Sequence, residues 1–132
     1  MSTTVGLIVG SLRKGSFTKA VAEQTAALLP EGYVVKQINI GDLDLYNQDL
    51  DDENRAPESW KKFRADVQSV DAVIFATPEY NRSVPGVLKN AIDVGSRPYG
   101  ASVWDKKPAI ILSVSPGAIS GFGANHHLRQ SL

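Results

Sequence analysis

The segment Val5-Gly6-Leu7-Ile8-Val9 is an unbroken apolar run, followed by a polar turn at residues 10–15 and an amphipathic stretch at residues 16–29. Such a run is typical of a strand buried on both faces. Ser16 or Gly15 can cap the helix that follows, and a Pro-Glu-Gly sequence at residues 30–32 ends it. One side of this helix is expected to carry four apolar residues, namely Phe17, Ala20, Val21 and Leu28. The opening of the chain therefore predicts a strand, a turn and a helix in succession.

The same alternation continues outward from this unit. Further strands are predicted at residues 33–40, 71–77 and 108–115, and further helices at residues 57–70, 84–94 and 124–132. The first of these helices places Trp60, Phe63, Val67 and Val70 at helical spacing, and the second does so with Val84, Val87, Leu88, Ala91 and Ile92. The strand at 33–40 alternates apolar and polar residues, which favours a place near an edge of the sheet. Residues 41–56 read as a long acidic loop.

Strands that alternate with helices in this way predict an α/β fold. Because crossovers between parallel strands are right-handed, the sheet should be parallel, with helices on both faces. Ligands of such sheets bind beyond the carboxyl ends of the strands, where the strand order switches. The loops to consider are therefore those at residues 10–18, 78–85 and 115–123, and these are rich in polar residues and glycine.

Composition narrows the class of protein. The chain has 132 residues, which suits one domain, and 14 basic and 14 acidic side chains give it a formal net charge of +0. The chain therefore has no overall excess of positive charge, which proteins that bind nucleic acid or an anionic membrane usually carry. The absence of cysteine excludes disulfides, a cysteine nucleophile and cysteine-based metal sites, and is consistent with a cytoplasmic protein. The apolar runs are too short to span a bilayer, and residues 1–4 lack the pattern of a signal peptide.

The first loop, residues 10–18, follows a buried strand and opens a helix, which is the setting for anion binding by helix N–H groups. It is neither a Walker A loop, because Gly15 is followed by Ser16-Phe17, nor a G-x-G-x-x-G fingerprint, because Gly10 is followed by Ser11-Leu12. Its hydroxyls and its arginine suit a terminal phosphate monoester, a dianion that takes many donors: Ser11, Arg13, Ser16 and Thr18. The alternative is an ordinary turn with a helix cap.

The other two loops allow a planar ligand. Tyr80 stands at the end of a strand, where an aromatic ring can pack on such a ligand, and Asn81 offers an amide. The alternative for this loop is a proline-framed turn whose tyrosine packs on the protein. In the third loop three glycines allow close approach of the backbone, and Ser115 lies where the strand ends, although a flexible connection would look the same.

No metal site and no catalytic set of side chains is predicted. His126 and His127 are adjacent on a predicted helix, so their side chains point apart. Lys89 and Asp93 are four residues apart on another helix, which indicates a surface or interface pair.

Taken together, the three loops resemble the NAD(P)H-dependent FMN reductase family, which includes bacterial chromate, quinone and azo reductases of flavodoxin-like fold. The resemblance runs from Val5 to the end of the chain, and its most specific part is the Glu-Tyr-Asn…Pro-Gly…Lys-Asn-Ala-Ile-Asp string at residues 79–93. Ser96-Arg97-Pro98 and Leu128-Arg129-Gln130 also match. This resemblance implies a three-layer sandwich whose parallel sheet has the strand order 2-1-3-4.

The resemblance also implies a role for each loop. The FMN phosphate would be held by the first loop, through Ser11, Arg13, Ser16, Phe17 and Thr18. The isoalloxazine ring would be bordered by Pro78, Glu79, Tyr80 and Asn81, and along its other edge by Ser115 and Gly117. NADPH or NADH would give a hydride to the flavin N5, and the reduced flavin would reduce a quinone, an azo compound, free flavin or a metal oxyanion such as chromate. The protein would supply no side-chain acid or base.

Members of the family usually work as homodimers or homotetramers on small-molecule acceptors. Two other functions stay open: an electron carrier that binds FMN without a nicotinamide site, and a truncated relative that has lost the flavin. Two departures from the family stand out. Ser120 stands where a glycine is expected before Gly121, and the family continues with a fifth strand and a helix after Leu132. Residues 1–132 are therefore expected to be one flavodoxin-like FMN-binding domain, C-terminally incomplete, and a fragment of a longer protein.

Overall fold

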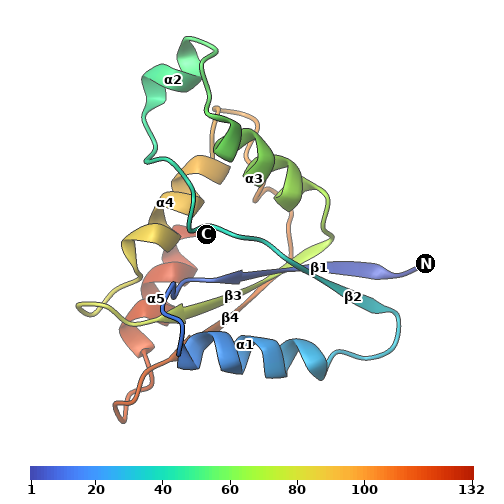
Figure 1. The fold of residues 1–132 in the computed structure, drawn as a ribbon, viewed down its shortest axis with the longest axis vertical. Coiled ribbons are helices and arrows are strands. Elements are labelled where there is room, and N and C mark those ends of the chain that lie inside the picture. The colour runs from blue at the N-terminus through green and yellow to red at the C-terminus, as the bar shows by residue number, and fades with distance from the viewer.

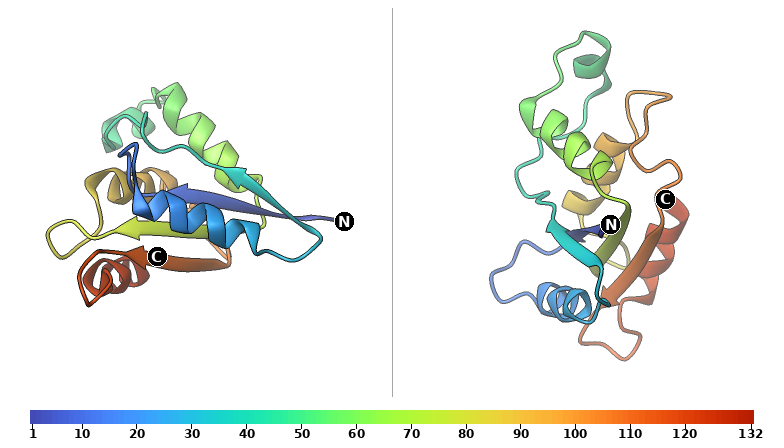
Figure 2. Two further views of the ribbon diagram at one scale, coloured as in Figure 1. Left: turned by 60° about the horizontal axis from the view of Figure 1, so that its bottom comes forward. Right: turned by 90° about the vertical axis from the view of Figure 1, so that its right-hand side faces the viewer.

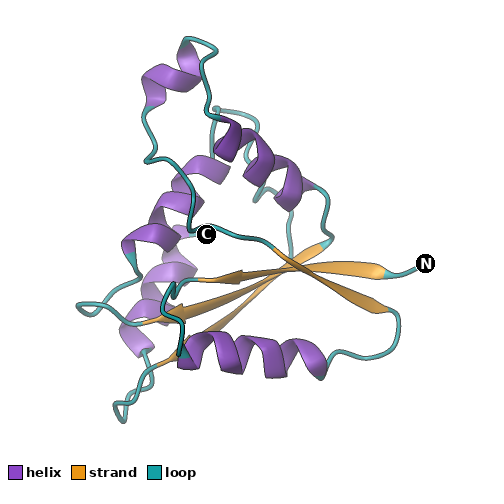
Figure 3. Cartoon of the chain, in the orientation of Figure 1, coloured by secondary structure: helices purple, strands orange, loops and turns teal.

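The computed structural model describes all 132 residues, and its strands and helices alternate along the chain (Figures 1 and 3). The strands are β1 (Thr3–Val9), β2 (Tyr33–Gln37), β3 (Ala72–Pro78) and β4 (Ala109–Val114). The helices are α1 (Phe17–Ala27), α2 (Gln48–Asp52), α3 (Glu58–Gln68), α4 (Gly86–Gly95) and α5 (Phe122–Ser131). Each predicted strand and helix is present, with ends displaced by up to three residues. None of the five helices has the length and apolar composition that crossing a bilayer requires.

The four strands form one parallel sheet in the order β2-β1-β3-β4, which confirms the predicted order. In the middle of the sheet Leu7 of β1 lies opposite both Gln37 of β2 and Ile74 of β3. The alternating strand β2 is an edge strand, as its pattern indicated, and β4 is the other edge. Since all strands run the same way, their carboxyl ends lie at one end of the molecule (Figure 1).

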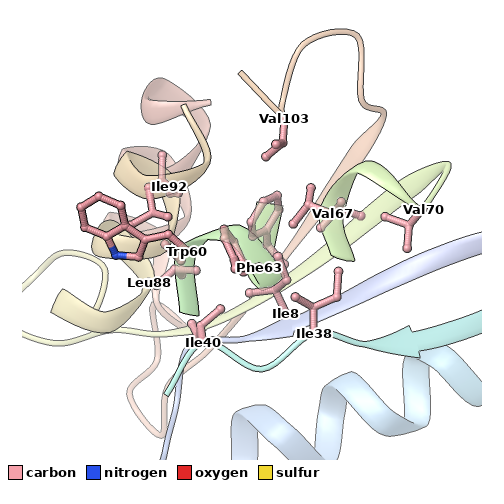
Figure 4. Close-up of a cluster of buried hydrophobic side chains, with 14 of the residues drawn as sticks. Ile8, Ile38, Ile40, Trp60, Phe63, Val67, Val70, Leu88, Ile92 and Val103 are labelled. Atoms are coloured by element: carbon pink, nitrogen blue, oxygen red, sulfur yellow. The ribbon is translucent and has the colours of Figure 1, made fainter. Parts of the chain in front are cut away.

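The helices cover the two faces of the sheet unequally (Figure 2). On one face a larger core joins Ile8 of β1 to Phe63 of α3 and Leu88 of α4 (Figure 4). This core also includes Val73, Phe75 and Leu128 of α5. Trp60 and Phe63, predicted to point inward from α3, are 0% and 2% exposed. On the other face α1 packs alone over a smaller core of Val5, Leu7, Ala22, Ile74 and Ala76. The result is the predicted three-layer arrangement.

The predicted inner side of α1 is wrong. Phe17, Val21 and Leu28 are exposed, and so is Ala20, whereas Thr18 and Ala22 are buried. A second row of residues, at positions 18, 22, 26 and 29, has the same helical spacing as the predicted one. The sheet packs against this second row, since Ala22 belongs to the smaller core and Ala26 and Leu29 pack against that core.

The predicted loop at residues 41–56 contains a short helix that the sequence reading missed. Asn47 caps α2, since its Oδ1 accepts a hydrogen bond of 3.1 Å from the N–H of Asp49. Asp51 of α2 forms a two-fold hydrogen-bonded ion pair with Arg64 of α3, at 2.8 and 2.7 Å. A helix of five residues is stable here because this tertiary contact holds it.

Candidate cofactor-binding site

A cavity of about 320 Å³ lies where the β1–α1, β3–α4 and β4–α5 loops meet. Figure 1 shows these three loops at the same end of the sheet. The cavity wall contains most of the residues predicted for the site: Ser11, Arg13, Ser16, Phe17, Thr18, Pro78, Glu79, Tyr80 and Ser115. Two predicted residues, Asn81 and Gly117, do not line it, and Val114 and Pro116 line it without having been predicted.

The β1–α1 loop supplies hydrogen-bond donors at the start of α1. Ser16 is the N-cap of the helix, and its Oγ accepts a hydrogen bond of 3.0 Å from the N–H of Lys19. Thr18 is 3% exposed, lines the cavity and makes no side-chain hydrogen bond within the protein. The first N–H groups of a helix have no acceptor within it, and they carry the positive end of the helix dipole. This end of the cavity therefore favours an anion.

Arg13 adds a positive charge to the same end. Its guanidinium Nη2 donates a hydrogen bond of 2.6 Å to the carbonyl of Gly15, and its Cζ lies 5.3 Å from the centre of the Phe17 ring. Phe17 was predicted on the inner side of α1 but is exposed, and its ring packs against the guanidinium of Arg13. Only one donor of Arg13 is used inside the protein, so the others are available to a ligand.

The β3–α4 loop is a tight turn stabilised by paired backbone hydrogen bonds between Tyr80 and Ser83, of 3.0 and 3.1 Å. The two central residues, Asn81 and Arg82, have φ angles of 51° and 68°. A turn with two positive φ angles favours asparagine at the first of them. Asn81 is therefore explained by the turn, and its predicted place beside a ligand is not supported by the cavity. Tyr80 lines the cavity and is 49% exposed.

Glu79 connects this loop to helix α5, a contact that the sequence reading missed. Its carboxylate Oε2 accepts a hydrogen bond of 3.0 Å from the N–H of Ala124, in the first turn of α5. His127, one turn further on, has its Nδ1 2.8 Å from the Oγ of Ser83. One carboxylate oxygen of Glu79 thus binds the start of the helix, and the two contacts hold the β3–α4 loop against α5.

The β4–α5 loop turns close to the cavity. The Oγ of Ser115 accepts a hydrogen bond of 3.2 Å from the N–H of Gly117, which lies outside the cavity wall. Ser120 has a φ angle of 53°, and the following Gly121 one of 78°. The family resemblance leads us to expect glycine at position 120, and the positive φ angle of Ser120 explains why, since glycine adopts positive φ without strain. The wall residues Val114 and Pro116 carry no polar group that the sequence could have marked.

Residues with distinctive ionisation lie elsewhere. Burial, followed by the charge of Asp51, raises the pKa of Tyr46, which packs on Trp60 outside the cavity. No three His, Asp or Glu side chains lie close enough together to hold a metal ion. Lys89 and Asp93 form an exposed ion pair of 2.6 Å on α4, as their spacing indicated. The cavity wall combines hydroxyl and guanidinium donors with a tyrosine and apolar side chains, a combination that suits a ligand with a phosphate and a planar ring.

The fold is that of a flavodoxin-like α/β protein, with a cavity beside the loop that follows its first strand. The chain belongs to the NADPH-dependent FMN reductase family, whose sequence model matches residues 3–132.

Several relatives carry names that describe reductases. A quinone reductase of Pseudomonas putida is 59% identical over 129 residues, which cover 98% of this chain and 69% of that protein. A 2-hydroxy-1,4-benzoquinone reductase of a Burkholderia species is 45% identical over the same shares. Among solved structures, the flavoenzyme NAD(P)H:(acceptor) oxidoreductase FerB of Paracoccus denitrificans has a TM-score of 0.90 and 41% identity, over 97% of this chain and 69% of FerB.

Proposed function

We propose that this protein binds FMN and catalyses the reduction of quinones by NADPH or NADH. The observation that carries this proposal is the cavity itself, which joins a phosphate-binding helix start to an aromatic strand end. The family to which the chain belongs and the names of its relatives from Pseudomonas putida and Burkholderia support the same function.

The residues present fit FMN. A phosphate monoester would receive hydrogen bonds from the hydroxyls of Ser11, Ser16 and Thr18 and from the guanidinium of Arg13. The Thr18 hydroxyl has no partner inside the protein, and in the cavity wall it could donate a hydrogen bond to a ligand oxygen. The isoalloxazine ring would lie between Tyr80 on one side and Ser115 on the other. In this proposal Asn81 and Gly117 act by shaping their turns.

The chemistry that FMN supplies when bound is two-electron transfer from a nicotinamide to an acceptor. The protein binds and orients the ring, and backbone N–H groups of the β3–α4 and β4–α5 loops would stabilise negative charge on it. No side chain is assigned as a catalytic acid or base.

The test combines an absorbance spectrum with an assay. The FMN-loaded protein should absorb as a flavoprotein and should oxidise NADPH or NADH when a quinone is added. Azo dyes, free flavin and chromate extend the panel of acceptors. Binding of FMN without oxidation of either nicotinamide would instead indicate an electron carrier, and failure to bind FMN would indicate a non-catalytic relative.

The proposal includes a homodimer or homotetramer. Phe17 and Tyr80 at the cavity and Ile119 and Phe122 in the adjoining β4–α5 region are 64%, 49%, 65% and 65% exposed. Exposed aromatic and aliphatic side chains of this kind are frequent in interfaces. Light scattering after size-exclusion chromatography measures the assembly, and a monomer would contradict this part of the proposal. A cytoplasmic location, where NADPH and NADH are regenerated, is part of the same proposal.

A further inference from the structure

Glu79 is the one acidic side chain in the wall of the cavity, where the other polar side chains are hydroxyls and the guanidinium of Arg13. A free carboxylate would repel the phosphate of a ligand, because like charges raise each other's energy. The carboxylate of Glu79 therefore has a role other than contact with the phosphate, and its hydrogen-bond partner shows where that role lies.

Helix α5 begins without a side-chain cap of its own. Its N-cap is Gly121, which has a φ angle of 78° and makes no side-chain cap hydrogen bond. The carboxylate of Glu79 takes this place, since its Oε2 accepts a hydrogen bond of 3.0 Å from the N–H of Ala124. A carboxylate at a helix start is stabilised by the free N–H groups and by the positive end of the helix dipole. Glu79 is therefore a cap that comes from forty-five residues away in the chain.

The β3–α4 loop and the start of α5 also approach each other closely. A Cβ added at Gly123 would lie 2.8 Å from Oε2 of Glu79 and 2.7 Å from the carbonyl oxygen of Arg82. Glycine at this position thus leaves the space that the carboxylate needs to reach the helix. In the same turn of α5, Asn125 donates from Nδ2 to the Oγ of Ser113 near the end of β4, at 3.2 Å. The start of α5 therefore contacts both the β3–α4 loop and β4.

These contacts join two walls of the cavity. Tyr80, the neighbour of Glu79, lines the cavity from the β3–α4 loop, and Ser115 lines it just after β4. Without the Glu79 cap, the contact between His127 and Ser83 would be the remaining hydrogen bond between this loop and α5. The relative position of the two walls thus depends on a carboxylate that contacts the helix.

We propose that Glu79 is a positioning residue: by capping α5 it holds Tyr80 and Ser115 in the arrangement that binds FMN. The inference rests on the proposed function, because FMN is the ligand whose ring these two residues would border. Glu79 acts through the helix and is assigned no proton transfer. The cap needs an acceptor oxygen, which the side-chain amide of glutamine also offers and alanine does not.

The binding test titrates FMN into the parent, Glu79→Ala and Glu79→Gln, followed by flavin fluorescence. Loss of the cap should raise the Kd of Glu79→Ala for FMN about fivefold or more, as is typical of coupled sites. Because amides and carboxylates cap helices about equally well, Glu79→Gln should stay within about twofold of the parent. Glu58→Ala is the matched control, since Glu58 lies in the first turn of α3, pairs with Lys61 and is outside the cavity.

Two results of this titration would overturn the proposal. Equal affinities of the parent and Glu79→Ala would show that the cap does not affect the cofactor site. An equal loss in Glu79→Gln and Glu79→Ala would show that the charge of Glu79, and not the cap, is responsible.

A second arm does not depend on FMN. In the protein without FMN, NMR should show hydrogen exchange of the Ala124 amide about three- to tenfold faster in Glu79→Ala than in the parent or Glu79→Gln, because its N–H is released. Glu79→Met, which keeps the side-chain length without an oxygen, should behave as Glu79→Ala does. Unchanged exchange would refute the cap even if FMN binds. Faster exchange in a protein that binds no FMN would refute the proposed function and leave Glu79 as a cap without a role in a cofactor site.

Discussion

The cavity depends on single residues whose donor groups are left without partners. Thr18 is buried and its hydroxyl makes no hydrogen bond in the protein, while Arg13 uses one donor for the carbonyl of Gly15. A donor at the cavity wall that has no partner in the protein can add a hydrogen bond to a ligand that offers an acceptor, and the ligand gains affinity. Binding of a phosphate should therefore be sensitive to each of these side chains.

Arg13→Ala should weaken FMN binding about ten- to a hundredfold, because a hydrogen bond to a charged group contributes about 1.5–3 kcal/mol. Quenching of flavin fluorescence during titration measures the affinity. Arg55→Ala is the matched control, since Arg55 is an exposed arginine that pairs with Glu53 outside the cavity. Equal affinities of the parent and the Arg13→Ala variant for FMN would show that Arg13 does not bind the phosphate.

Gly123→Ala should disturb the contact between α5 and the β3–α4 loop. An added Cβ would lie 2.7 Å from the carbonyl oxygen of Arg82 and 2.8 Å from Oε2 of Glu79, so the helix or the loop must move. Strain of this kind typically lowers the free energy of unfolding by about 1–3 kcal/mol, and urea denaturation measures it. Gly86→Ala at the start of α4 is the control, because its Cβ would meet nothing within 4 Å. Similar losses in both variants would show that the close approach is not the cause.

At the scale of elements, helix α2 is held by tertiary contacts rather than by its own length, because Leu50 packs against the larger core and Asp51 pairs with Arg64. The side chains of Asp51 and Arg64 are 5% and 13% exposed, and Arg64 also donates from Nε to the carbonyl of Val94 at 2.9 Å. The guanidinium thus connects α2, α3 and α4. Because the guanidinium is largely buried, loss of the carboxylate leaves its charge without an anionic partner.

Asp51→Ala should lower the free energy of unfolding by about 3–5 kcal/mol, as expected when one partner of a buried ion pair is removed. Urea denaturation followed by circular dichroism measures the change. Asp93→Asn removes the carboxylate of an exposed pair with Lys89, and should change stability by no more than about 0.5 kcal/mol. If the two variants lose the same small amount, the buried pair does not stabilise α2 as described.

At the scale of the whole molecule, a charged cluster joins an edge of the sheet to the helix layer. Lys36 of β2 and Lys62 of α3 donate hydrogen bonds of 2.8 and 2.5 Å to the carboxylate of Asp66. Burial acts to raise the pKa of Asp66, but the two lysines outweigh it and hold the pKa below its usual value. The ionised form of Asp66 is therefore favoured by folding.

This shift predicts how acid affects the molecule. A carboxyl group whose pKa is lower in the folded state contributes stability above its unfolded pKa, near 4, and the contribution is lost as the pH falls through the folded pKa. Asp66→Asn should reduce the loss of stability below about pH 4, as measured by urea denaturation at several pH values. Lys36→Met removes one of the two donors and should reduce the loss partly. A parent and an Asp66→Asn variant with the same pH dependence would contradict this role.

Much of the architecture follows from local patterns. The apolar runs at 5–9 and 71–77, the helical spacing of Trp60, Phe63 and Val67, and the right-handed crossover rule together predict the parallel sheet, and the structure confirms it. The same rule brings the three ligand loops to one end. Ser16 and Thr18 could be predicted as site residues because a hydroxyl at the start of a helix can cap the helix or donate to a ligand, whatever the rest of the fold.

The order of the elements, the loops that meet at the cavity and the polar groups of these loops could be predicted, because they depend on residues close together in the chain. Three features could be known only from the folded chain: which side of α1 is buried, the ion pair of Asp51 with Arg64, and the hydrogen bond that Glu79 accepts from Ala124, forty-five residues later. These features are contacts between distant segments, and a contact of that kind is fixed by how layers pack rather than by any local pattern.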